Sequence, residues 1–292
     1  MRTRSLGPGA TAVGVVGYGA WPLSDGAPRP REDDAVRAIH AALDGGATLI
    51  DTADAYCLHE GEAGHNERLV ARALSTWRGP REEIVVATKG GYTRPDGAWV
   101  SNGRPEHLRR ACDRSLAALG VERIDLYQLH GPDPEVPLAE SVGLLADLAR
   151  EGKIRWVGLS NVSVDELRQA REQVAVTTVQ NRLNPFFREA VADGVVAYCD
   201  QEGLGFLAYS PVGGGRLNKK LPAIAALAPI ARRHGVSHHA VALAWVLAQG
   251  TSVIVIPAAR QPEHVADSQA AARIELTPDE LATIDGTEFS IA

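Results

Sequence analysis

Eight short apolar runs rich in β-branched residues alternate with longer segments of helical period along the chain of 292 residues. Runs such as IVVATK and IDLYQLH are nearly continuous in apolar character, which is typical of parallel strands covered on both faces. Eight β/α units predict an α/β fold, a closed (β/α)8 TIM barrel, in a single domain over residues 1–292 rather than an open sheet. The predicted strands are residues 13–18, 48–51, 84–89, 124–130, 156–160, 178–181, 205–209 and 253–256.

The segments between these strands repeat their apolar residues at spacings of three and four, as Leu108, Ala111, Cys112 and Ser115 do. Before the first strand, residues 6–13 predict a small β-hairpin that plugs the N-terminal mouth of the barrel. LTPDELATIDGTEF, near the end of the sequence, predicts an extra C-terminal helix. The other predicted helices are residues 31–43, 66–76, 105–119, 138–150, 164–171, 191–201, 221–233 with 237–249, and 262–270.

Composition narrows the partner class. The formal charge is −6, and the 30 basic residues are scattered rather than gathered into a stripe. We therefore expect a small-molecule partner and neither a nucleic acid nor a membrane, with the oligomeric state, monomer or homo-oligomer, left open. Three distant cysteines, no apolar leader and no apolar run of about 18 residues predict a reduced, cytoplasmic protein.

Polar residues end the predicted strands, and catalytic groups of a barrel collect at the C-terminal ends of its strands. Titratable groups follow the first strands: Asp51 and Tyr56 after the second, Lys89 after the third and His130 after the fourth. Taken singly, each has an ordinary structural explanation. Four at the ends of three consecutive strands favour a catalytic site. Amide and hydroxyl groups follow the later strands, at Ser160, Asn161, Gln180, Asn181, Tyr209 and Ser210.

The titratable set suits carbonyl chemistry. A tyrosine beside a lysine ammonium is expected to be more acidic than its reference pKa of about 10, and so to become a proton donor. An aspartate would hold the ammonium in place, and a neutral histidine could orient a carbonyl oxygen. None of these groups donates a hydride, which indicates a reduced nicotinamide cofactor.

Six strings in order and spacing resemble the aldo-keto reductase family: DTADAY (51–56), VVATKGG (85–91), DLYQLHG (125–131), GLSN (158–161), VQNRLNPF (179–186) and AYSPVGGG (208–215). The resemblance covers nearly the whole chain. It implies a catalytic tetrad of Asp51, Tyr56, Lys89 and His130, with Tyr56 as the general acid. It also implies a substrate pocket lined by Trp21, Tyr56, Cys57, Tyr92 and His130.

The same resemblance implies the cofactor contacts. Ser160, Asn161 and Gln180 would bind the nicotinamide carboxamide, and Tyr209 would stack on the ring. A glycine-rich loop would cover the pyrophosphate, because glycine lets backbone N–H groups approach phosphates closely. The loop residues are Ser210, Pro211, Val212, Gly213 and Gly215, and the remaining implied contacts are Gly19, Ala20, Trp21, Asp51, Arg260, His264, Asp267 and Ser268.

The segment IPAARQPEHVADS (256–268) departs from the pattern of NADPH-using members. Ala258 and Ala259 stand where Lys or Gly and then Ser are usual, and His264 stands where Arg or Lys is usual. Arg260 is the only full positive charge in reach of a 2′-phosphate. NADPH is preferred by the resemblance and NADH is possible, with a smaller preference than the family norm.

Three further features are ambiguous. The stretch after Tyr56 is longer than usual and starts with Cys57 in place of Gly; it either narrows the substrate mouth or forms an exposed acidic loop. His234, His238 and His239 favour a solvated helix cap, and no metal is expected. Trp77, Trp99 and Trp245 are interpreted as packing residues.

The sequence thus predicts an NAD(P)H-dependent aldo-keto reductase that reversibly reduces an aldehyde or ketone to an alcohol. The alternative is a nicotinamide-binding, redox-sensing regulatory subunit with little turnover, like the potassium-channel β subunits of the family. No extension that would bind a partner is evident, which favours the enzyme. The sequence does not identify the natural substrate.

Overall fold

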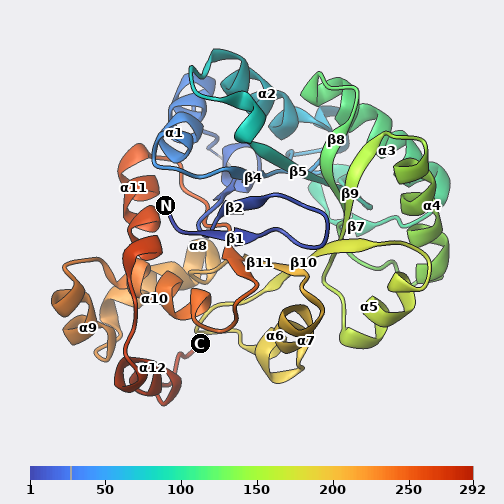
Figure 1. Ribbon diagram of the computed structural model, residues 1–292. Coiled ribbons are helices and arrows are strands. Elements are labelled where there is room, and N and C mark those ends of the chain that lie inside the picture. Colours follow the sequence, from blue (N-terminus) through green and yellow to red (C-terminus); the bar gives the residue numbers. More distant parts are fainter. Residues whose placement is uncertain (27, 292) are drawn as a thin grey trace.

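Eight parallel strands close into a barrel in the computed structural model, which describes residues 1–26 and 28–291 (Figure 1). Their order is β3-β4-β5-β8-β9-β10-β11-β12, and every neighbouring pair is parallel. The two edge strands meet through a bridge between Val16 and Val255, which closes the barrel. The predicted (β/α)8 TIM barrel is confirmed.

The barrel strands are short, and most of their residues are buried on both faces. Their bounds are β3 Tyr18–Gly19, β4 Leu49–Asp51, β5 Val85–Gly90, β8 Ile124–Leu129, β9 Ile154–Ser160, β10 Val176–Arg182, β11 Gly205–Tyr209 and β12 Val253–Val255. The helices cover the outside of the barrel (Figure 1). Their bounds are α1 Glu32–Asp44, α2 His65–Thr76, α3 Pro105–Leu119, α4 Leu138–Arg150, α5 Val164–Arg171, α6 Glu189–Ala192, α7 Val195–Glu202, α8 Gly214–Leu217, α9 Leu227–His234, α10 His238–Leu247, α11 Pro262–Ala270 and α12 Pro278–Asp285.

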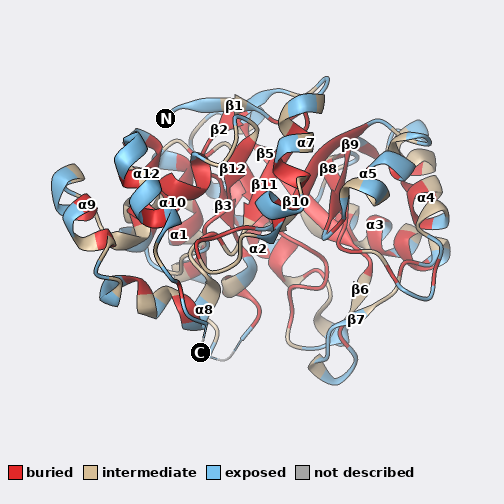
Figure 2. Ribbon diagram, turned by 90° about the horizontal axis from the view of Figure 1, so that it is seen from below, coloured by how far each residue is buried: buried red, intermediate tan, exposed pale blue. Residues whose placement is uncertain are grey.

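The expected hairpin plugs one end of the barrel. Strands β1 Thr3–Ser5 and β2 Ala12–Gly14 pair antiparallel, and Leu6 and Val13 enter a cluster with inward residues of the barrel strands. The hairpin approaches β11 so closely that position 205 must be glycine, because a Cβ there would lie 2.1 Å from the carbonyl oxygen of Leu6. Figure 2 shows this hairpin at one end of the molecule and β6, β7 and α8 at the other.

Four features of the predicted secondary structure need correction. Val13 belongs to the hairpin, and the first barrel strand is β3, because one apolar run feeds both elements. The predicted helix 191–201 is two helices, since Gly194 adopts a left-handed φ of 79° between them. The predicted helix 221–233 begins only at Leu227, because Pro222 lies in a preceding 3₁₀ turn. No strand was predicted between residues 89 and 105, where the structure has an antiparallel pair, β6 Tyr92–Thr93 and β7 Val100–Ser101.

The extra C-terminal helix is present as α12. It begins with a capping box, in which Thr277 and Glu280 satisfy each other's backbone N–H groups. Glu280 also accepts from Arg233 at 2.9 Å and lies 3.1 Å from Nε2 of His234. The helix is thereby fastened to the end of α9. Among the described residues, no helix has the length and apolar character needed to cross a membrane.

Candidate active site

The four predicted catalytic residues converge at the open end of the barrel. Asp51 is the last residue of β4, Lys89 lies near the end of β5, and His130 directly follows β8. Nζ of Lys89 donates to Oδ2 of Asp51 at 2.6 Å, to Oη of Tyr56 at 3.1 Å and to the carbonyl oxygen of Thr52 at 3.0 Å. The ring centroid of His130 lies 5.7 Å from that of Tyr56. The grouping predicted from strand ends is therefore present.

Burial controls the charges of this group. Lys89 is fully enclosed, and desolvation lowers its pKa while the charge of Asp51 opposes that shift. For Tyr56, desolvation, followed by the charge of Asp51, raises the pKa well above its ordinary value. The expectation of a more acidic phenol is therefore wrong for the free protein: Tyr56 is a firmly protonated phenol held against an ammonium.

His130 is neutral in this setting. Burial, and then the charge of Lys89, lower its pKa well below the usual range. Its Nδ1 has no hydrogen-bond partner within residues 1–26 and 28–291. A neutral imidazole at the mouth can present an N–H to a carbonyl oxygen without adding a charge, as expected from the residue types.

Two glutamines complete the shell of Asp51. Nε2 of Gln180 donates to Oδ1 of Asp51 at 2.7 Å, and Nε2 of Gln128 approaches the same oxygen at 3.4 Å. Gln128 pairs in register with Lys89 on the neighbouring strand, so its side chain occupies the same layer of the barrel. Sequence reasoning missed Gln128, although its place two residues before His130 puts it on the inward face of β8.

The amide and hydroxyl groups expected to meet nicotinamide also gather here. Oη of Tyr209 donates to Oδ1 of Asn161 at 2.8 Å, and Nδ2 of Asn161 donates to the carbonyl oxygen of His130 at 3.0 Å. Oγ of Ser160 donates to the backbone oxygen of Gln180 at 2.7 Å. Asn161 adopts a φ of 57°, a left-handed conformation that the surrounding bonds maintain.

The loop after β11 presents its backbone rather than its side chains. Ser210, Gly213 and Gly214 have φ values of 48°, 90° and 72°, and a Cβ added at Gly215 would meet no described atom within 4 Å. Nδ2 of Asn184 fixes this loop by donating to the carbonyl oxygen of Ser210 at 2.9 Å. An open glycine backbone next to amide side chains fits the pyrophosphate and nicotinamide of a dinucleotide.

Polar side chains of segment 256–268 are engaged within the protein. This segment therefore fits a 2′-phosphate less well than the preceding residues fit the nicotinamide and pyrophosphate. Nε and Nη1 of Arg260 donate to the carbonyl oxygens of Pro22 and Pro28, at 2.9 and 3.1 Å. Asp267 accepts from Oγ of Ser237 at 2.7 Å, and Oγ of Ser268 donates to the backbone of His264. The one full charge expected to face the phosphate is thus engaged by the chain itself.

An aromatic wall surrounds the mouth. The ring centroid of His130 lies 4.9 Å from that of Tyr92 and 5.7 Å from that of Trp99, and Trp99 lies 6.3 Å from Tyr56. Trp99 is 41% exposed, and its covered part packs against these rings, so its interpretation as a packing residue holds in part. No local signal marked Trp99, because Tyr56 and His130 are distant in sequence. Cys57, expected in the pocket, is buried, and its Sγ contacts the carbonyl oxygen of Ala55.

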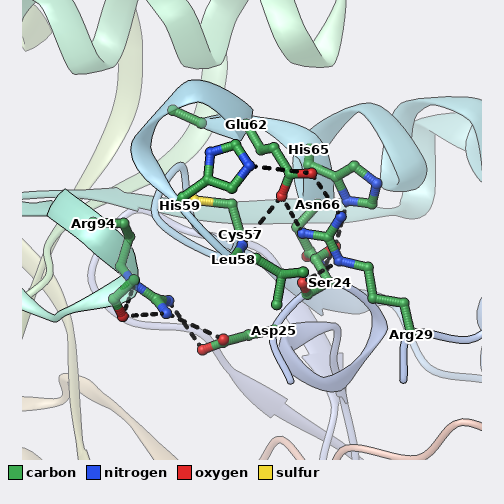
Figure 3. A network of polar contacts seen from close by, with 12 residues as sticks. Ser24, Asp25, Arg29, Cys57, Leu58, His59, Glu62, His65, Asn66 and Arg94 are labelled. Atoms are coloured by element: carbon green, nitrogen blue, oxygen red, sulfur yellow. Dashed lines mark hydrogen bonds and ion pairs between the residues drawn. The ribbon is translucent and has the colours of Figure 1, made fainter. Parts of the chain in front are cut away.

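The long stretch after Tyr56 exposes His59, Glu60 and Gly61 but is tied down by its acidic side chains (Figure 3). Both carboxylate oxygens of Glu62 accept from Arg29, and one also accepts from the backbone of Leu58 at 3.2 Å. The bond to Arg29 is the main reason that the pKa of Glu62 falls to about 2. Glu60 accepts from the backbone N–H of Arg94 at 2.7 Å. Its acidic side chains therefore join this stretch to the rim of the site.

Two of the three histidines at the end of α9 and the start of α10 have partners within the protein, unlike residues of a solvated helix cap. His234 contacts the carboxylate of Glu280, a partner that the sequence interpretation had not assigned. Nε2 of His239 lies 2.9 Å from the carbonyl oxygen of Asn218. In the part of the chain that the structure describes, no three His, Cys, Asp or Glu side chains are grouped so that they could hold a metal ion.

Comparison with known proteins agrees with this geometry. The model of the Aldo/keto reductase family matches residues 15–288. Probable aldo-keto reductase 1 of Glycine max is 32% identical over 309 residues, covering 96% of this chain and 86% of that protein. The match over most of the chain defines the class of this protein as an oxidoreductase. The chain belongs to the Aldo/keto reductase family.

Solved structures extend the likeness to the whole fold. The glycerol dehydrogenase AKR11B4 from Gluconobacter oxydans superposes with a TM-score of 0.84 at 32% identity, covering 97% of this chain and 94% of that one. An aldo-keto reductase from Klebsiella pneumoniae in complex with NADPH gives a TM-score of 0.80 at 30% identity, covering 98% of this chain and 95% of that one.

Proposed function

We propose that this protein reduces an aldehyde or ketone to an alcohol with a nicotinamide coenzyme, reversibly, and that Tyr56 is the general acid. The observation that carries the proposal is the position of Lys89, whose Nζ contacts both Asp51 and the phenol oxygen of Tyr56. Lys89 has no exposed surface, and burying an ammonium group is energetically unfavourable unless partners compensate for its lost hydration.

Each residue of the tetrad has a distinct task. Neutral His130 donates a hydrogen bond to the substrate carbonyl oxygen and sets its orientation. As negative charge develops on that oxygen, the phenol of Tyr56 transfers its proton to it, which forms the alcohol O–H and leaves a phenolate. Lys89 stabilises that phenolate through the N–H already directed at it, and Asp51 keeps Lys89 charged.

The residues present fit the nicotinamide end of the coenzyme. Ser160, Asn161 and Gln180 supply amide and hydroxyl groups, and Tyr209 supplies an aromatic ring held by Asn161. When bound, a reduced nicotinamide supplies the hydride that adds to the carbonyl carbon. Gln180 now donates to Asp51, so binding of a carboxamide by its side chain would use its oxygen or exchange that bond.

Coenzyme preference is proposed by analogy. The relative from Klebsiella pneumoniae is in complex with NADPH, which supports NADPH here. The engagement of Arg260 by Pro22 and Pro28 supports a weak preference, with NADH as a usable alternative. A cytoplasmic site of action is part of the same proposal, supported by three cysteines that are free and buried.

The test is turnover with Tyr56→Phe. The purified protein should oxidise NADPH with a simple aromatic aldehyde, and Tyr56→Phe should lose on the order of a hundredfold or more of kcat, the usual contribution of a general acid. Coenzyme binding, followed by fluorescence quenching, should persist in the variant. A variant as active as the parent would remove Tyr56 from the mechanism. A parent that binds coenzyme without turning over any carbonyl compound would favour the redox-sensing alternative.

A further inference from the structure

Two exposed tryptophans flank the site. Trp21 follows β3 in a 3₁₀ turn and is 43% exposed, and Trp99 precedes β7 and is 41% exposed. Large aromatic side chains are seldom left this accessible without a partner surface or ligand. Trp99 also lies edge-on to the rings of Tyr56 and His130, so it borders the position of the reacting carbonyl.

One buried ion pair holds both tryptophans. Oδ2 of Asp25 accepts from Nε1 of Trp21 at 2.8 Å and from Nη1 of Arg94 at 3.0 Å. The guanidinium carbon of Arg94 lies 4.2 Å from the ring centroid of Trp99, in cation–π contact. Asp25 is 8% exposed and Arg94 4% exposed. The two charges, paired with each other in Figure 3, are therefore held inside the protein rather than facing solvent.

The same arginine is anchored to the catalytic turn. Nη1 of Arg94 donates to the carbonyl oxygen of Ala55, the residue before Tyr56, at 3.2 Å. Its Nε and Nη2 donate to the carbonyl oxygen of Gly97 at 3.2 and 2.9 Å, within the turn that leads to Trp99. Arg94 thus connects the backbone beside the general acid to the turn that carries Trp99.

These commitments leave an apolar wall. The N–H of Trp21 and the N–H groups of Arg94 that reach Asp25, Ala55 and Gly97 are already used inside the protein. A carboxylate or a polyhydroxylated substrate would find these donors occupied, whereas a flat ring could stack on the indole faces. The ion pair therefore makes this wall apolar without itself contacting the substrate.

We propose that Asp25 and Arg94 are positioning residues for substrate specificity. By fixing Trp21 and Trp99, they select carbonyl compounds that carry a planar aromatic ring over aliphatic and polyhydroxylated ones. The inference rests on the proposed carbonyl reductase function and specifies its substrate class.

The experiment compares kcat/KM for 4-nitrobenzaldehyde, propanal and glyceraldehyde at saturating NADPH. The parent should favour the aromatic aldehyde by at least about tenfold, the scale of one well-packed aromatic contact. The variant Asp25→Asn/Arg94→Met removes both charges together, so that no unpaired charge stays buried. It should lose at least about fivefold of that ratio through a larger rise in KM for the aromatic aldehyde than for propanal.

A matched control uses the other ion pair of the rim. Arg29 and Glu62 join the segment that carries Asp25 to the stretch after Tyr56 and contact neither tryptophan in the bonds described, so Arg29→Met/Glu62→Gln should leave the ratio within about twofold. Trp21→Phe removes the bond to Asp25 and part of the stacking surface, keeps an aromatic ring, and should reproduce part of the loss even if the double variant fails to fold.

The outcomes separate the two proposals. A parent that reduces all three compounds with similar efficiency, or an unchanged ratio in both Asp25→Asn/Arg94→Met and Trp21→Phe, overturns the specificity role and leaves carbonyl reduction standing. Equal losses in both double variants overturn it too, because general loosening of the rim would then explain them. A parent that reduces none of the compounds overturns both proposals.

Discussion

Two buried carboxyl groups behind the tetrad should make stability fall as pH rises. Asp54 and Glu67 have almost no exposed surface, and Oδ1 of Asp54 and Oε2 of Glu67 have no partner among the described residues. Arg114 reaches Oδ2 of Asp54 at 3.3 Å, and Thr88 donates to Oε1 of Glu67 at 2.6 Å. Burial, followed by the charge of Glu67, raises the pKa of Asp54 to about 8.

The sign and size follow from linkage. Because the folded pKa of Asp54 is above the unfolded one, the proton stabilises the fold fully below pH 4, and that stabilisation is lost as pH rises toward about 8. One bound proton corresponds to about 1.4 kcal/mol per pH unit, so between pH 5 and pH 8 the free energy of unfolding should fall by about 4 kcal/mol. Glu67 shares this titration, since burial raises its pKa too.

The assay is urea unfolding followed by tryptophan fluorescence at pH 5 to 9, for the parent and Asp54→Asn. Asparagine resembles the protonated acid, so the variant should lose most of this pH dependence and be more stable than the parent above pH 8. Asp165→Asn, at an exposed aspartate of α5, is the control and should follow the parent. If Asp54→Asn retained the full decline, Asp54 would be ionised in the fold and the reasoning would be refuted.

Two further predictions concern the coenzyme and the barrel plug. The ratio of the Kd for NADH to the Kd for NADPH, measured by fluorescence quenching, should stay below about a thousandfold, roughly 4 kcal/mol. His264→Arg should raise this ratio by adding a positive charge near the 2′-phosphate. A larger ratio in the parent would contradict the inference that the 2′-phosphate is weakly bound. Gly205→Ala should cost about 3 kcal/mol or more, because its Cβ would lie 2.1 Å from the backbone oxygen of Leu6. The control is Gly143→Ala within α4, where the nearest atom is 3.6 Å from the added Cβ, and it should slightly raise the free energy of unfolding. If chemical denaturation showed similar effects for the two substitutions, the close contact between Gly205 and Leu6 would be disproved.

The fold was predictable where one pattern spans a whole element. Runs such as residues 84–89 carry both the strand and its terminal lysine, so the barrel and the tetrad follow from the same observation. The pair β6 and β7 was not predictable, because strands of two residues are too short to show alternation. The break at Gly194 was visible as a glycine within a helical pattern, but its left-handed φ was not.

The site was predictable in its residues and less so in its electrostatics. Residue types at strand ends place Tyr56 beside Lys89, as the structure does. They do not show how deeply the pair is buried, and depth reverses the direction of the tyrosine pKa. The place of Trp99 beside the site was not predictable for a related reason. Its neighbours Tyr56 and His130 lie far away in the sequence, and its contact with Arg94 depends on the folded loops.

The raised pKa of Tyr56 alters the role of Lys89. A phenol that is already acidic would be partly ionised before a substrate arrives and would lose the proton needed for reduction. Burial keeps that proton on Tyr56, and Nζ of Lys89, 3.1 Å away, acts only as charge appears on the phenol oxygen. Because Asp51 and its two glutamine donors fix the ammonium beforehand, the stabilisation needs no rearrangement at the moment of transfer. In the proposed mechanism the same arrangement would serve alcohol oxidation, in which a phenolate beside Lys89 would accept the proton.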